Sequence, residues 1–172
     1  MKKILAVVIM LLSVCYAEEI KFLEIPFGSS EAIVRKEMNT KGWKLKDEDN
    51  NAMELDKYNI MSNLFFSGNT FAGKEVKSVN TEFLNDRLYR VTIYFKDGYN
   101  TSKIINAYIK KFNLIEEETP YFSVVVEKYK TASGKEYISF VSERNELTIT
   151  NSNYSKMREP DGPSQEEIDA DI

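Results

Sequence analysis

Two consecutive runs of alternating apolar and polar residues constrain the fold of this chain more than any other feature of its sequence. In the run 76–83, the residues on one side of an extended chain are Val79, Thr81 and Phe83. In the run 87–96, one side carries Tyr89, Val91, Ile93 and Phe95, and the other carries Arg90, Thr92 and Tyr94. Asn85 and Asp86 lie between the runs and favour a tight turn. The sequence therefore predicts a β-hairpin.

Two helices and several more strands are predicted around this hairpin. Residues 30–41 and 101–113 have helical spacing, with Val34 and Met38 on one face of the first. The second helix has an amphipathic stripe that we expect to lie in the core, formed by Ile105, Tyr108, Ile109 and Phe112. Further strands are predicted at 20–25, 63–67, 122–128, 136–142 and 147–150, and a loop at 46–59. Short turns join the strands, which predicts an α+β fold with an antiparallel meander sheet.

A helix followed by strands occurs twice along the chain. The first helix precedes the strands that end near residue 96, and the second precedes those that end near residue 150. We therefore predict a single domain over residues 18–154, with a hypothesis that its halves, 18–98 and 99–154, are a duplicated unit.

The two ends of the chain differ in character from this domain. Residues 1–17, MKKILAVVIMLLSVCYA, have a basic start, a short apolar run and small residues at the end, which is typical of a secretory signal peptide. We expect cleavage after Ala17 and an exported protein, periplasmic or secreted. An alternative is lipid anchoring through Cys15, because LSVC loosely resembles a lipobox. Residues 155–172 are acidic and rich in Pro and Gly, and we predict a disordered tail there.

Composition excludes several function classes. The 172 residues include no His, and the one Cys lies in the predicted signal peptide. Cys/His zinc sites, Ser-His-Asp triads and Cys-His pairs are therefore excluded. The mature charge of (23 − 2) − 27 = −6 disfavours a nucleic-acid partner. No apolar stretch after the signal is long enough to span a membrane.

Two segments partly match cofactor motifs. GNTFAGKE at 68–75 approaches a P-loop, but Glu75 replaces the magnesium ligand and the next residues have strand spacing, so we predict a loop between strands. Asp47, Asp49 and Asn51 resemble the start of a calcium loop, but Ala52 and Tyr58 occupy the positions that need Gly and Glu. We therefore expect no catalytic residue, cofactor or metal.

Four aromatic residues are the candidates for contact with a partner. Phe71 lies between two glycines, and we expect it to fold into the core or, as the alternative, to form an exposed contact point. The other three candidates are Phe66, Trp43 and Tyr94. Aromatics on both faces of the second hairpin strand indicate that something else covers one face.

Two stretches resemble a known family. These are IPFGSSEAIVRKEM and FSGNTFAGKEVKSVNTEFLNDRLYRVTIYF, within residues 22–96. They resemble small exported bacterial domains of the outer-membrane assembly lipoprotein type (SmpA/OmlA, BamE), and the arrangement is similar to the β-lactamase-inhibitor-protein fold. The resemblance implies helices packed on one face of an antiparallel sheet, and binding of other proteins in place of catalysis.

Three functions follow as hypotheses. The first is an exported, non-enzymatic domain that binds another envelope or extracellular protein, which a flat exposed aromatic patch would favour. The second is a binding protein for a small apolar or peptide ligand, which a buried apolar pocket would favour. The third is a hydrolase that uses two carboxylates, which would need two acids converging in a cleft. The partner and the oligomeric state stay open.

Overall fold

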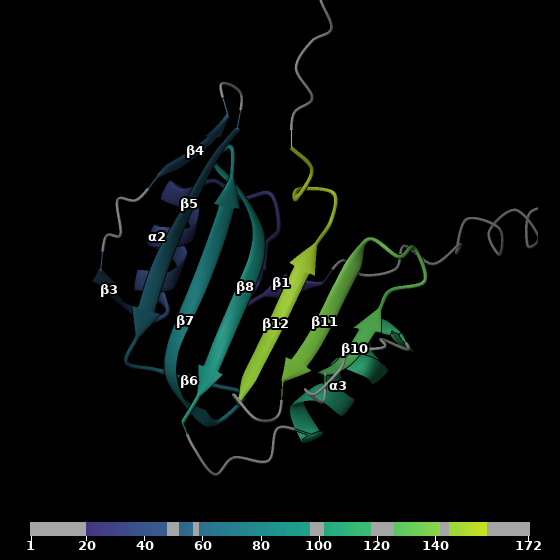
Figure 1. The fold of residues 1–172 in the computed structure, drawn as a ribbon. Helices are drawn as coiled ribbons and strands as arrows, with labels where there is room; N and C mark the ends of the chain where they lie inside the picture. The colour runs from purple at the N-terminus through teal and green to yellow at the C-terminus, as the bar shows by residue number, and fades with distance from the viewer. Residues whose placement is uncertain are drawn as a thin grey trace, which may run out of the picture.

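The computed structural model describes residues 20–47, 52–56, 59–96, 102–117, 126–141 and 145–157. The predicted signal peptide, most of the predicted tail and three of the calcium-like positions, Asp49, Asn51 and Tyr58, lie outside these residues. Two helices and a large antiparallel sheet make up the described part (Figure 1), which confirms the predicted α+β class. None of the helices in that part is long and apolar enough to cross a membrane.

The sheet contains ten strands in a meander-like order. Along the chain the elements are β1 (Lys21–Phe22), β2 (Ile25–Pro26), α2 (Glu31–Thr40), β3 (Lys44–Asp47), β4 (Met53–Asp56), β5 (Asn59–Ser67), β6 (Thr70–Phe71), β7 (Lys74–Leu84), β8 (Arg87–Phe95), α3 (Ser102–Phe112), β9 (Ile115–Glu116), β10 (Val126–Lys130), β11 (Glu136–Val141) and β12 (Glu146–Asn151). Across the sheet the order is β3-β5-β7-β8-β12-β11-β10-β9, with β4 paired to β5 and β6 to β7. β1 and β2 form a separate small hairpin.

Strands β8 and β12 join the two halves of the sheet. They pair antiparallel, with Val91 opposite Ile149. In each half a helix precedes the strands of the large sheet, and the last strand lies at the centre of that sheet (Figure 1). This order is the one that a duplicated unit would have, and the duplication itself stays a hypothesis.

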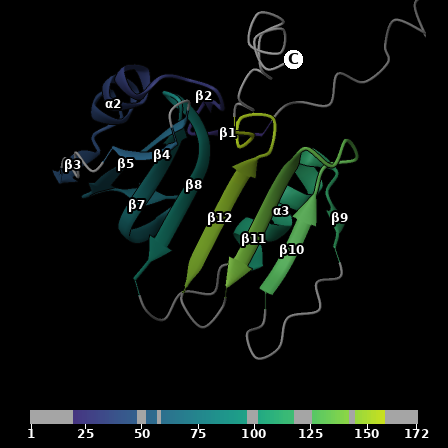
Figure 2. The ribbon, with the colours of Figure 1, turned by 45° about the horizontal axis from the view of Figure 1, so that its top comes forward.

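Both helices and the β1–β2 hairpin lie on one face of the sheet, and the other face is open (Figure 2). Helix α2 begins after Ser30, whose side chain accepts a hydrogen bond from the Ile33 N–H. Its buried residues are Val34 and Met38, as the spacing predicts. Helix α3 contributes Ile104 and Ile105 to the same core, with the rest of the predicted stripe packed against it. The core therefore lies between the helices and the sheet.

The β7–β8 hairpin is confirmed, but its alternation is broken at Tyr89. Glu82 pairs with Arg90 and Phe83 pairs with Leu88, so Tyr89 is an extra residue in β8. The predicted placement of Tyr89 on the same side of the strand as Val91 and Ile93 is therefore wrong, although Tyr89 is buried at 8% exposure. Its hydroxyl bonds Glu82 on the open face, and Leu88 is fully buried in the core instead. The Leu88 backbone N–H and C=O pair with the residues that follow β2, Gly28 and Ser29.

Two other segments differ from prediction. Residues 20–25 were expected as one strand, but Leu23 and Glu24 have positive φ angles of 51° and 65°, so the chain turns back at once as β1 and β2. Part of the expected loop at 46–59 is strand, because β3 and β4 pair with the outer edge of β5. A strand pairs with the edge of a sheet through backbone N–H and C=O groups, so the side-chain pattern of these residues did not indicate that they form strands.

Candidate functional site

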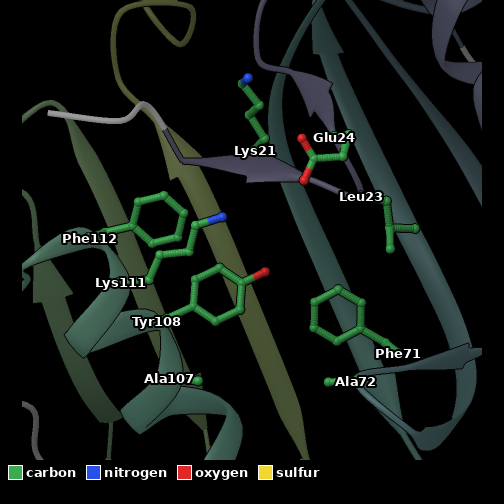
Figure 3. A pocket seen from close by; sticks show the side chains of 9 residues that line it. All are labelled: Lys21, Leu23, Glu24, Phe71, Ala72, Ala107, Tyr108, Lys111 and Phe112. Atoms are coloured by element: carbon green, nitrogen blue, oxygen red, sulfur yellow. The ribbon is translucent and has the colours of Figure 1, made fainter. Parts of the chain in front are cut away.

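A pocket of about 320 Å³ opens on the helix-bearing face, between α3, the β1–β2 turn and the turn after β6. Figure 3 shows the side chains that line it: Lys21, Leu23, Glu24, Phe71, Ala72, Ala107, Tyr108, Lys111 and Phe112. The pocket has an apolar floor and charged groups at its edge.

Two tight turns hold one wall of the pocket in place. In the β1–β2 turn, Leu23 and Glu24 both have positive φ, which lets the chain reverse over two residues. The turn after β6 has the same character, with Ala72 at 50° and Gly73 at 73°. Such turns match the twist of the strands they join, so the pocket wall is fixed by hairpin geometry.

The floor of the pocket is a row of aromatic rings that continues into the core. Phe71 stacks on Phe22 with 5.7 Å between ring centroids, and on Tyr108 with 6.4 Å. Tyr108 lies 5.6 Å from Phe112. These distances fall in the range of favourable aromatic pairs. Because Phe71 is 6% exposed and Phe22 is fully buried, the floor is anchored in the core.

The Tyr108 hydroxyl points toward the open space of the pocket (Figure 3). Burial raises the pKa of Tyr108 to about 12, because the charged phenolate would lose its hydration. The hydroxyl is therefore a neutral donor and acceptor for a ligand at any physiological pH.

The raised pKa of Tyr108 can be measured directly. In NMR spectra of protein labelled with ¹³C at tyrosine Cζ, the resonance that Tyr108→Phe removes should keep its neutral position up to about pH 11. The pKa of Tyr108 is higher in the folded protein than in the unfolded chain, so the unfolded chain loses this proton first as pH rises. The free energy of unfolding should therefore fall as pH rises above about 10. If that resonance instead shows Tyr108 losing its proton with a midpoint near pH 10 in the folded protein, the buried position of the ring is contradicted.

The edge of the pocket carries mixed charge with a basic excess. Lys21 and Lys111 line it together with one acid, Glu24. The Lys111 amino group lies 5.1 Å from the centre of the Phe112 ring. Helix α3 as a whole contains three lysines and no acidic residue, although the protein is acidic. A basic edge in an acidic protein favours a ligand with negative charge.

The four predicted contact residues fall at three different places. Phe71 lies in the floor of the pocket, and its expected burial is confirmed. Trp43 and Phe66 come together beside α2, where they line a second depression of about 350 Å³, but they are 2% and 1% exposed. Tyr94 lies half-buried on the open face of the sheet, opposite Glu146. Only Phe71 belongs to the aromatic pocket.

The open face of the sheet has side chains that pair with one another. Glu82 accepts hydrogen bonds from the Tyr89 hydroxyl at 2.8 Å and from Arg90 at 3.1 Å. Burial first, and the contact with Glu82 second, raise the pKa of Tyr89 to about 12. Thr92 and Thr148 share a hydrogen bond across β8 and β12. These internal pairs occupy several polar groups of the face, while the buried Oδ1 of Asn80 beside Thr92 has no hydrogen-bond partner. The pocket, by contrast, is a hollow lined by aromatic rings, so we take the pocket as the candidate site.

Carboxylates do not converge in either depression. Glu24 is the single acid among the residues that line the two, and the basic residues beside α2 include Arg35, which pairs with Glu31. Within the described ranges, no group of three or more Asp, Glu, Cys or His side chains is placed to hold a metal ion. The arrangement in the pocket suits binding and offers no pair of acids for hydrolysis.

Several pocket residues were not identified as site residues from the sequence. Tyr108 and Phe112 were assigned to the core stripe of α3, and Lys21 and Leu23 to a strand. The signal that could have found them is the pairing of an aromatic stripe with adjacent lysines on one helix. A stripe of this kind more often packs entirely into a core, so the sequence alone favoured that interpretation.

Comparison of the chain with protein-family models, with curated proteins and with solved structures finds no match. The resemblance to outer-membrane assembly lipoproteins therefore stays a prediction.

Proposed function

We propose that this chain is an exported, non-enzymatic domain that binds another envelope or extracellular protein, and that its aromatic pocket accepts an apolar side chain of that partner. The observation that carries the proposal is the open pocket with a stacked aromatic floor, rooted in the core by the contact between Phe71 and Phe22. Export is supported by the signal-like residues 1–17.

The size and openness of the pocket favour a side chain over a whole small molecule. Small-molecule sites usually enclose most of their ligand in about 300–1,000 Å³. This pocket is at the lower end, at about 320 Å³, and is open on one side. Interfaces between proteins concentrate their binding energy in central pockets of this kind, filled by one aromatic or aliphatic anchor. A small apolar ligand in the same pocket is the second candidate, because the floor is apolar and Tyr108 offers a hydroxyl.

Filling the pocket should abolish partner binding without unfolding the protein. Ala107 lines the pocket and is exposed, so Ala107→Trp can occupy the space without burying a strained side chain. Asn106→Trp is the matched control, because Asn106 is also exposed on α3 but does not line the pocket. In affinity capture from the host envelope and medium, followed by mass spectrometry, we expect one dominant partner whose recovery falls about tenfold or more with Ala107→Trp alone.

Two outcomes would count against the proposal. Equal recovery with both tryptophan variants would show that the pocket is not the contact site. Recovery of no protein above the blank would contradict protein binding and favour the small-ligand alternative. Circular dichroism of both variants checks that the fold is kept.

A further inference from the structure

We infer that the partner segment presents a carboxylate next to its apolar side chain, and that Lys111 binds this carboxylate at the pocket edge, with Lys21 adding positive charge there. The inference rests on the proposed function and names the chemistry that the pocket selects. A residue pair of this kind, an aromatic followed or preceded by Asp or Glu, would place the ring on Phe71 and Tyr108 and the acid at Lys111.

The two lysines approach the pocket from different elements. Lys21 belongs to β1 and Lys111 to the last turn of α3. In Figure 3 the Lys111 amino group extends toward the space above Tyr108, and Lys21 rises at the upper edge of the same space. Lys111 is therefore the lysine placed beside a ring held in the pocket, and Lys21 adds positive charge at the upper edge.

Glu24, the acid at the pocket edge, determines on which side of the pocket the partner's carboxylate can lie. Glu24 lies in the β1–β2 turn, across the space from α3 (Figure 3). A second carboxylate beside it would be repelled, whereas one on the α3 side meets Lys111. The partner's acid should therefore face α3 while its apolar side chain fills the floor.

The mixed charge also separates a protein segment from an anionic lipid. Surfaces that bind anionic membranes carry clusters of basic residues, roughly four to eight, near the surface. Here two lysines and one acid line the pocket. That pattern suits a defined acid beside a defined side chain, so the inference commits to a protein segment.

Short blocked peptides test this chemistry without knowledge of the partner. The probes are acetylated, amidated hexapeptides with a central Phe-Asp pair, and versions with Phe-Asn, Phe-Lys and Ala-Asp at the same place. Each is titrated into the full chain, and the methyl resonances of Ala72 and Ala107 are followed by NMR. We expect the dissociation constant of the Phe-Asp peptide to be about two- to fivefold lower than that of the Phe-Asn peptide for each lysine that contacts the acid. The Ala-Asp peptide should not shift the methyl resonances of Ala72 and Ala107.

Charge-removing variants assign the effect to the lysines. Lys111→Gln should remove most of the preference for Phe-Asp over Phe-Asn, and raising the salt concentration should weaken that preference. Lys110→Gln is the matched control, since Lys110 is exposed on the same turn but does not line the pocket. The preference should survive in that variant.

The outcomes separate the inference from the proposed function. Equal binding of Phe-Asp, Phe-Asn and Phe-Lys would overturn the acid preference while leaving the apolar pocket in place. Absence of any shift with all four peptides would overturn the inference, and capture of a partner that Ala107→Trp loses would then still support the proposed function. If short-chain fatty acids shift these methyl resonances and the peptides do not, the occupant is a lipid and the inference is wrong.

Discussion

Replacing Phe22 by alanine is expected to lower the free energy of unfolding by about 3–5 kcal/mol. Phe22 is fully buried, and its ring stacks on Phe71 at 5.7 Å beneath the pocket. Removing it leaves a cavity between the β1–β2 hairpin and the sheet that the surrounding strands cannot close. Urea denaturation followed by circular dichroism measures the loss.

Ile33→Ala is the control for this measurement. Ile33 lies on α2 and is 50% exposed, so its truncation should change stability by no more than about 0.5 kcal/mol. If Phe22→Ala costs as little as Ile33→Ala, then the β1–β2 hairpin does not pack on the core, and the pocket has no fixed wall on that side.

The second large effect is expected at Gly28. Its φ angle is 85°, and a Cβ placed there would lie 2.6 Å from Cζ of Tyr154. The position cannot move freely, because the Gly28 N–H donates to the Leu88 carbonyl oxygen at 2.8 Å. Gly28→Ala should therefore combine backbone strain with overpacking, at a cost of about 2–4 kcal/mol.

Gly73→Ala isolates the backbone part of this cost. Gly73 has a similar φ of 73°, but no atom lies within 4 Å of an added Cβ. Its substitution should cost about 1–2 kcal/mol, from the left-handed backbone alone. Equal losses in the two variants, measured by thermal and urea unfolding, would contradict the contact between Tyr154 and the segment after β2.

Much of the fold could be predicted because its strongest elements carry local signals. The β7–β8 hairpin has both the alternation and the Asn85-Asp86 turn, and both turn residues have the positive φ that a two-residue hairpin needs. Helix α2 has its cap at Ser30 and its buried face at Val34 and Met38. Here local preference and tertiary packing agree.

The error at Tyr89 arose where long-range pairing decided the local structure. Tyr89 follows the alternation of β8, but Leu88 must pair with the segment at Gly28 and Ser29, and the resulting bulge turns Tyr89 to the open face. No short-range pattern contains that contact, since its partners lie about 60 residues apart along the chain. The error at 20–25 has a local cause instead: Leu23 and Glu24 adopt positive φ angles, so the segment folds as a hairpin and not as one strand.

The pocket could not be predicted for the same reason as the bulge at Tyr89. Phe71 and the stripe of α3 were each recognised, but separately. Their contact at 6.4 Å depends on where the chain brings α3 against the turn after β6. The sequence thus identified the aromatic residues, and the fold determined which of them share a site with Lys21 and Lys111.

The most direct test of the central claim is photocrosslinking in the producing cell. A diazirine-bearing lysine analogue replaces Lys111 at the pocket edge, and the same analogue at Lys110 serves as the control. If the pocket holds a partner's side chain, irradiation should join position 111 to one protein in high yield and position 110 to that protein weakly or not at all. No adduct at position 111, or the same adducts at both positions, would contradict binding through the pocket.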